Sequence, residues 1–186
     1  MNELLDDKRI RNVTYNKLYK TELFEDIEFP VGRIFEDIFT TYKLIDKSNI
    51  VVYTGKPLYY YYRSNGSILR SSFNVKRFDK VYACKERASY YFEYYPNLFP
   101  KASNVYVKSA LVSLANSSNG NKEVLSARKA IRNTLLQWID RYSLSLPTKE
   151  KISCNLLRLG LPTYDMSVGT ACRIIGKVKK NDKRMG

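Results

Sequence analysis

Apolar residues in the C-terminal part of the chain recur at the spacing of an amphipathic helix. The first apolar stripe begins after Asn74 and ends at Pro96, and four further stripes follow it along the chain. Residues that favour turns separate these stripes, at 117–120, Pro147, Gly160 and Pro162. Aromatic and methionine side chains at this spacing are typical of a protein core, so we predict a helical bundle over residues 74–186.

Nearer the N-terminus, a turn containing Pro and Gly precedes one strongly apolar helical pattern, which includes Ile34 and carries Glu36 and Asp37 in its first turn. Adjacent residues of a helix point about 100° apart, so two neighbouring carboxylates cannot both avoid the buried side. The free N–H groups and the dipole at a helix start favour an ionised carboxylate. A partly enclosed, ionised carboxylate on a rigid element suits a general base. The alternative is that both carboxylates only complement the helix dipole on a solvated edge.

Shorter patterns surround this helix. A charged stretch over residues 1–11 is typical of a short helix or a frayed lead-in, and residues 21–25 favour one helical turn. Apolar and β-branched runs predict short strands over 13–19, 50–53 and 58–62, of which the last two form a hairpin. Because side chains alternate along a strand, two of the four consecutive tyrosines should pack on the helix and two should face outward or toward a ligand. These elements predict an α+β, mostly α fold, with short strands around the Glu-Asp helix and a C-terminal helical bundle.

Three blocks of the sequence resemble, in the same order, motifs of the bacterial family-2 glycosyltransferases. The blocks are residues 15–24, with YNKLYK followed by ELF; residues 29–37, with FPVG followed by Glu-Asp; and residues 57–68, with PLYYYYRSNGSI. The resemblance covers about residues 12–72, and the remainder resembles only the variable helical tail of such enzymes. In that family, the aspartate of the Glu-Asp motif is the base that deprotonates the acceptor hydroxyl.

The resemblance implies transfer of a sugar from a nucleotide donor to a polysaccharide or lipid-linked acceptor, with inversion at the anomeric carbon. Asp37 would take the acceptor proton, and Glu36 would set the helix start and the local field. The residues that would contact substrate lie in the first and third blocks and are Asn16, Lys17, Arg63 and Ser67. Arg63 suits this role because a guanidinium binds phosphate through two hydrogen bonds, although an arginine at a strand end is equally a surface residue.

The same resemblance divides the chain into an acceptor-side catalytic segment, residues 1–73, and a C-terminal helical region, residues 74–186. Enzymes of this family begin with a nucleotide-binding α/β half, in which an Asp-x-Asp motif holds a divalent metal, Mg or Mn, and the nucleotide-sugar. No stretch of this sequence resembles that half, and we expect no metal site in this chain. The chain would be a truncated reading frame, an excised domain or one part of a split enzyme with a partner chain, inactive or very weak alone.

Composition narrows the possible chemistry. A chain of 186 residues with 44% hydrophobic and 27% charged residues is typical of one globular domain, or of one domain with a helical appendage. It contains no histidine, which excludes Ser-His-Asp and Cys-His catalysis and histidine-ligated zinc. Its three cysteines are far apart, which favours neither a disulfide framework nor a zinc site and fits a reducing cytoplasm.

The net charge of +14 is unevenly distributed. Residues 1–48 are slightly acidic, and most of the basic surplus lies in residues 121–186, where it includes the basic tail Lys177, Lys179, Lys180, Lys183 and Arg184. Such a surface favours anionic lipid, nucleic acid or a phosphorylated ligand, although it also serves solubility.

Hydropathy and charge together give two further expectations, one about location and one about an alternative function. No apolar run approaches the ~20 residues of a membrane span, so we predict a cytoplasmic protein that binds peripherally at the inner face of the cell membrane. The alternative function is a non-enzymatic basic helical module that binds nucleic acid or an anionic membrane surface. Of these two partners, nucleic acid is the weaker expectation.

Overall fold

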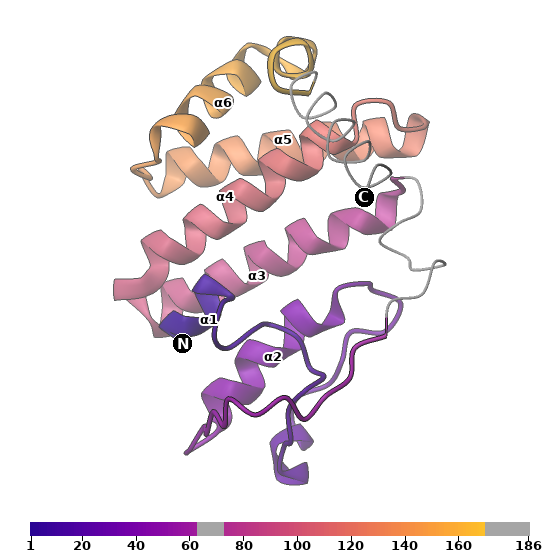
Figure 1. Ribbon diagram of the computed structural model, residues 1–186. Coiled ribbons are helices and arrows are strands. Elements are labelled where there is room, and N and C mark those ends of the chain that lie inside the picture. Colours follow the sequence, from indigo (N-terminus) through magenta and orange to yellow (C-terminus); the bar gives the residue numbers. More distant parts are fainter. Residues whose placement is uncertain (63–72, 170–186) are drawn as a thin grey trace, which may run out of the picture.

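Helices account for most of the structure, a computed structural model that describes residues 1–62 and 73–169 (Figure 1). The longer helices are α2 (Glu36–Lys47), α3 (Asp79–Tyr94), α4 (Phe99–Asn116), α5 (Lys122–Arg141) and α6 (Thr148–Leu159). The shorter elements are α1 (Asn2–Asp6), α7 (Leu161–Tyr164), the 3₁₀ turns Thr21–Phe24, Val75–Phe78 and Pro96–Leu98, and the π turn Asp165–Gly169. The mostly helical fold class is confirmed, and each apolar stripe up to residue 169 corresponds to a helix.

The helices form a bundle in which α4 is central. It packs against α3 on one side and against α5 and α6 on the other, while α2 packs on the opposite side of α3 (Figure 1). One stripe of each helix faces this bundle, which is why the apolar residues recur at helical spacing. The core includes the fully buried side chains Phe78, Val81, Tyr91, Tyr106, Leu114, Leu135 and Leu157.

Polar contacts fasten α2 to α3 near both ends of α2. Ahead of α2, Arg33 Nη1 donates a hydrogen bond of 2.7 Å to the carboxylate of Asp79, at the start of α3. Near the other end of α2, the Asp46 carboxylate accepts hydrogen bonds from the hydroxyls of Tyr90 and Tyr95. The position of α2 is therefore set by α3.

Asn12 joins the N-terminal segment to α2 and α3 in the interior. Its side-chain amide donates to the Leu4 carbonyl at 2.7 Å, and its Oδ1 accepts from Arg87 Nη1 at 2.6 Å. Its backbone carbonyl accepts from Thr41 Oγ1 at 3.3 Å. Asn12 and Arg87 are both buried, so the hydrogen bond between them satisfies polar groups that are removed from water. The hydrogen bond to Arg87 joins the predicted catalytic segment, residues 1–73, to the predicted helical region, residues 74–186. The division of the chain into these two domains stays a prediction.

The short strands predicted over 13–19, 50–53 and 58–62, and the hairpin of the last two, are not formed in the part of the chain that the structure describes. A strand requires a neighbouring backbone to complete its ladder of hydrogen bonds. Within residues 49–62 the backbone amides make local hydrogen bonds: the Leu58 amide donates to the Lys56 carbonyl at 3.0 Å, and the Lys56 amide donates to the Thr54 hydroxyl at 3.3 Å. The sequence pattern was that of a strand, but the described residues supply no partner for it.

The predicted alternation of side chains is nevertheless present. Tyr60 and Tyr62 are 88% and 78% exposed, whereas Tyr59 and Tyr61 are 48% and 56% exposed. The expected partner of the inward pair was the Glu-Asp helix, but the rings of Tyr59 and Tyr61 stack instead on Tyr15. The segment therefore has one face turned toward the molecule and one turned toward solvent.

Candidate functional site

An uncommon backbone conformation begins α2 and places Glu36 and Asp37 at its first two positions. Phe35, the residue before the helix, is left-handed with a φ of 62°, which is rare for a bulky side chain. The Asp79 carboxylate holds the chain at this point, because it accepts from the Ile34 amide at 3.0 Å as well as from the preceding arginine. Backbone strain persists only where surrounding contacts determine it, and such positions cluster at functional sites.

Asp37 is half-buried at the start of α2, whereas Glu36 beside it is exposed. Asp37 Oδ1 accepts from the Ile38 amide at 2.8 Å, and the same amide donates to the Phe35 carbonyl at 3.0 Å. Burial raises the pKa of Asp37 above its ordinary value; the Ile38 hydrogen bond opposes this shift, and the charge of Glu36 adds to it. A carboxylate with a raised pKa is a better proton acceptor. This environment suits a general base, and the catalytic roles of Asp37 and Glu36 stay predictions.

Lys17, one of the predicted substrate-binding residues, lies within electrostatic reach of Asp37. Burial lowers the pKa of Lys17, while the negative charges of Asp7 and Asp37 oppose that shift. Its Nζ donates to the Val13 carbonyl at 2.5 Å. The structure therefore brings together a half-buried cation and a half-buried carboxylate from two different sequence blocks.

The other predicted substrate-binding residues are placed differently. Asn16 is exposed and left-handed, with a φ of 60°. Asparagine tolerates this conformation better than most residues, so the turn itself accounts for an asparagine at this position. Arg63 and Ser67 lie outside the described residues.

Tyr15 links the third sequence block to Asp37. Its ring stacks on that of Tyr59, with centroids 5.3 Å apart and planes inclined by 21°, and on that of Tyr61, at 5.4 Å and 24°. Burial raises the pKa of Tyr15, and the charge of Asp37 contributes to the same shift. Tyrosines of the first and third blocks thus stack on one another, and the charge of Asp37, from the second block, acts on both Tyr15 and Lys17.

Sequence reasoning missed two residues that build this site. Asp79 lies far along the chain from the backbone that it holds, and its position at a helix start gave no sign of this contact. Tyr15 belongs to the first of the three sequence blocks, but the sequence does not show that its ring stacks on Tyr59 and Tyr61 of the third block. Tyr15 and Lys17 are two positions apart, and residues at this spacing lie on the same face of an extended segment, which was the available signal.

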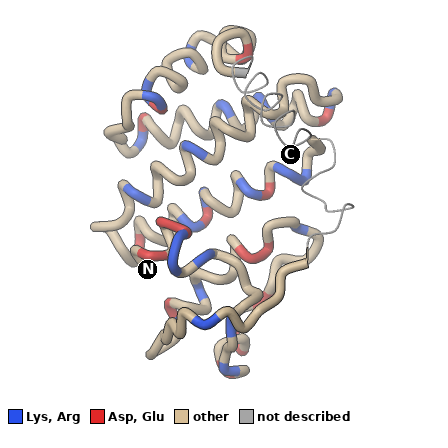
Figure 2. Tube along the Cα trace, in the orientation of Figure 1, with Lys and Arg blue, Asp and Glu red and all other residues tan. Residues whose placement is uncertain are grey.

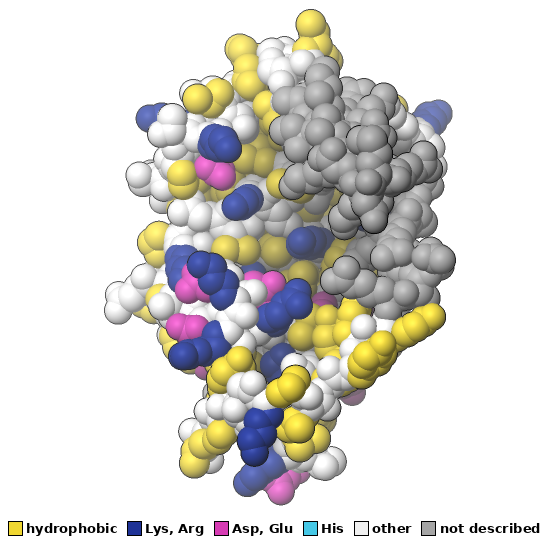
Figure 3. All heavy atoms as spheres, viewed as in Figure 1, with side chains coloured by type: hydrophobic (Ala, Val, Ile, Leu, Met, Phe, Trp, Pro, Cys, Tyr) yellow, Lys and Arg dark blue, Asp and Glu magenta, His cyan; other side chains and the backbone are white. Residues whose placement is uncertain are grey.

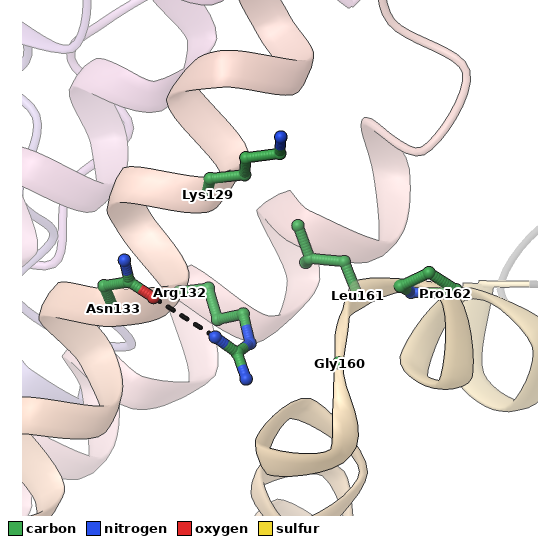
Figure 4. Close-up of a pocket in the computed structure, with 6 residues that line it drawn as sticks. All are labelled: Lys129, Arg132, Asn133, Gly160, Leu161 and Pro162. Carbon is green, nitrogen blue, oxygen red and sulfur yellow. Dashed lines mark hydrogen bonds between the residues drawn. The ribbon is translucent and has the colours of Figure 1, made fainter.

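A separate open pocket lies between α5 and the turn from α6 to α7 (Figure 4). It is lined by Lys129, Arg132, Asn133, Gly160, Leu161 and Pro162. Arg132 is already engaged there, because its Nε donates to the Leu157 carbonyl at 2.7 Å and its Nη2 to the Arg158 carbonyl at 3.1 Å. These contacts satisfy carbonyls at the end of α6. The pocket and α2 lie at opposite ends of the bundle (Figure 1), so the pocket takes no part in the site at Asp37.

Two further properties bear on function. Within residues 1–62 and 73–169, no group of three or more His, Cys, Asp and Glu side chains is placed to hold a metal ion. Cys84 and Cys154 are buried and unbridged. No helix in the described ranges combines the length and the apolar character that crossing a bilayer requires.

Comparison with known proteins adds a class of activity. No protein-family model and no solved structure matches the chain. Glycosyltransferase GlyG of Streptococcus pneumoniae serotype 4 is 37% identical over 59 residues, which are 32% of this chain and 20% of GlyG. The chain is similar, in part, to glycosyltransferases. Glycosyltransferase GlyA of the same organism is 39% identical over 56 residues, which are 30% of this chain and 8% of GlyA.

The matched part spans less than a quarter of the length of either relative. The activity of the whole relatives is therefore only a proposal for this chain.

Proposed function

We propose that this chain is the acceptor-side part of an inverting family-2 glycosyltransferase, which moves a sugar from a nucleotide donor to a polysaccharide or lipid-linked acceptor. The partial similarity to two glycosyltransferases supports the general class. One observation carries the finer proposal: tyrosines of the first and third sequence blocks stack on one another, and the charge of Asp37, from the second block, acts on both Tyr15 and Lys17.

The proposed reaction uses Asp37 as its base. The carboxylate accepts the proton of the acceptor hydroxyl while that oxygen attacks the anomeric carbon of the donor sugar. The bond to the nucleoside diphosphate breaks on the opposite face, which inverts the anomeric configuration. Glu36 supplies negative potential that raises the pKa of Asp37. The Ile38 amide and the helix dipole oppose that rise because both favour the ionised carboxylate, which is the form that can take up the acceptor proton.

A divalent metal, Mg or Mn, would neutralise the negative charge that develops on the leaving diphosphate. The described residues do not fit such an ion, because they bring no group of three potential ligands together. We therefore assign the metal and the nucleotide-sugar to a nucleotide-binding half that is separate from the described residues.

The surface of residues 50–62 offers a contact for that half. The outward side chains of this segment are 77% to 88% exposed, and they are Ile50, Val52, Leu58, Tyr60 and Tyr62. Figure 3 shows hydrophobic side chains along the lower edge of the molecule, where this segment runs in Figure 1. An alternating apolar segment without a ladder partner suits addition to the edge of a β-sheet. The nucleotide-binding half, in the same polypeptide or in a partner chain, is the occupant that we assign to it.

Calorimetry with the chain alone tests whether the donor site lies in the nucleotide-binding half and not in this chain. Because the described residues lack a metal site and the sequence lacks an Asp-x-Asp motif, we expect no metal-dependent binding of UDP-glucose, UDP-N-acetylglucosamine or UDP-galactose in Mg or Mn buffers. The matched control is the same titration in EDTA, which should give the same baseline heats. Micromolar binding that requires the metal would contradict the proposal, because it would place the donor site in this chain.

We also propose a place for the protein at the cytoplasmic face of an anionic membrane, where a lipid-linked acceptor would lie. The basic tail that carries this proposal, with Lys177, Lys179, Lys180, Lys183 and Arg184, lies outside the described residues. In the described residues, Lys and Arg are spread along the helices among acidic residues (Figure 2). The alternative, a nucleic-acid-binding module, would instead show a preference for DNA or RNA over anionic liposomes at matched salt.

A further inference from the structure

Three tyrosines from two separate segments form a stacked cluster on the surface of the molecule. Tyr15 stacks with both Tyr59 and Tyr61 at centroid distances of 5.3 and 5.4 Å, and its plane is nearly parallel to both of theirs. All three side chains remain partly exposed. Each ring is held by its stacking contacts and still presents part of its surface to solvent.

Tyr59 and Tyr61 lie on one face of the segment 58–62. Tyr59 and Tyr61 alternate with Tyr60 and Tyr62, which are more exposed. The face that carries the cluster is turned toward Tyr15, whose electrostatic surroundings include the Asp37 carboxylate. The opposite face is the one that we assign above to the nucleotide-binding half. The two faces therefore offer different surfaces for different partners.

The chemistry of this inner face fits a sugar ring. A pyranose has C–H groups on a relatively apolar face and hydroxyls around its rim. The C–H groups carry slight positive charge and pack well on the negative face of an aromatic ring. Tyrosine hydroxyls can both donate and accept hydrogen bonds at the rim. Rings already held by stacking lose little conformational freedom when a ligand binds, which favours the complex.

We propose that Tyr15, Tyr59 and Tyr61 form an aromatic platform that binds a pyranose ring of the saccharide acceptor, with the reacting hydroxyl directed toward Asp37. This inference rests on the proposed function, since it names the group that Asp37 would deprotonate. It adds that the acceptor is recognised through its sugar ring by this chain, rather than through a lipid or the nucleotide-binding half alone.

The test uses the full 186-residue chain with two soluble probes, cellohexaose and chitohexaose. Binding is followed by NMR of ¹³C-labelled tyrosine rings and by calorimetry. We expect at least one probe to bind with a dissociation constant on the order of millimolar and to shift the ring signals of Tyr59 and Tyr61. The paired variant Tyr59→Ala/Tyr61→Ala should weaken this binding about tenfold or more, because it removes two stacking surfaces.

A matched control comes from the same segment. The paired variant Tyr60→Ala/Tyr62→Ala removes two tyrosines from the outward face and should change the dissociation constant by less than about twofold, since its rings are not part of the platform. The pair Tyr59→Phe/Tyr61→Phe should keep most of the affinity, because it retains both rings. All four positions are substantially exposed, so the variants should melt near the wild-type temperature, and circular dichroism checks this.

Two results would overturn the platform: no binding of either probe to the wild-type chain, or equal weakening by the outward and inward pairs. Asp37→Asn separates this inference from the proposed function, because a chain without the base should still bind the probes like the wild type. If the wild type binds and the complete enzyme transfers sugar without needing Asp37, the base assignment fails and the platform stands. If transfer needs Asp37 but neither probe binds, the platform alone fails.

Discussion

Asp37→Asn should lower kcat by roughly 10²–10⁴-fold in the complete enzyme, or in this chain reconstituted with its nucleotide-binding half. Asparagine keeps the size of the side chain and can still accept the Ile38 hydrogen bond, but it cannot take up the acceptor proton. The affinity for the nucleotide-sugar should be nearly unchanged, because we assign the donor site to the other half. Steady-state kinetics and a donor titration measure the two quantities separately.

Glu36→Gln is the matched control for this variant. Glu36 is adjacent and also acidic, but it is exposed and acts on Asp37 only through its charge, so its loss should reduce kcat by less than about tenfold. A folding defect is not expected in Asp37→Asn, since burial disfavours the charged carboxylate that the substitution removes. An Asp37→Asn enzyme that kept more than about a third of wild-type activity would remove Asp37 from the role of base.

Asn12→Ala should lower the free energy of unfolding by about 3 kcal/mol. The substitution removes the acceptor of Arg87 Nη1 and the donor to the Leu4 carbonyl, both in the interior. A buried guanidinium that loses its partner is costly because water cannot replace the lost hydrogen bond. Urea unfolding monitored by circular dichroism gives the difference between the variant and the wild type.

Asn155→Ala provides the comparison for that measurement. Asn155 is exposed on α6, where alanine has a slightly better helix propensity, so stability should be unchanged or rise by a few tenths of a kcal/mol. Equal unfolding curves for Asn12→Ala and the wild type would show that the buried contacts of Asn12 contribute little to the fold.

The helices were predictable because their signals are local. The apolar stripes, the turn residues between them and the Pro and Gly residues at their ends lie within short windows of sequence. A helix with Glu36 and Asp37 in its first turn was expected on the same grounds, from the Pro/Gly turn and the pattern that follows it, although the predicted pattern already included Ile34. The single helical turn at residues 21–25 was also predicted, and the structure has it at Thr21–Phe24.

The strands could not be predicted from the same kind of signal. A period of two in residues 58–62 correctly indicated that the tyrosines alternate between an inward and an outward face, because alternation depends on the local backbone. Whether such a segment becomes a strand depends on a second segment that supplies hydrogen bonds, which is a non-local condition. In the described residues this condition is not met.

The candidate site was predictable only in part, for the same reason. Motif resemblance selected Asp37, which lies in the first turn of α2, and Lys17, on which the charge of Asp37 acts. It gave no indication that Asp79 holds the backbone before that helix or that Tyr15 receives the tyrosines of the third block. These contacts join segments that are distant in sequence, and neither leaves a periodic pattern.

The pH dependence of kcat/KM in the complete or reconstituted enzyme tests the central claim most directly. A base must be unprotonated to act, so activity should fall as the pH falls through the pKa of Asp37. Because burial raises that pKa, the acid limb should lie above the ordinary range of an aspartate, about 3.9. The limb should disappear from the residual activity of Asp37→Asn. A wild-type limb at the ordinary value, or one that persists unchanged in Asp37→Asn, would contradict the account.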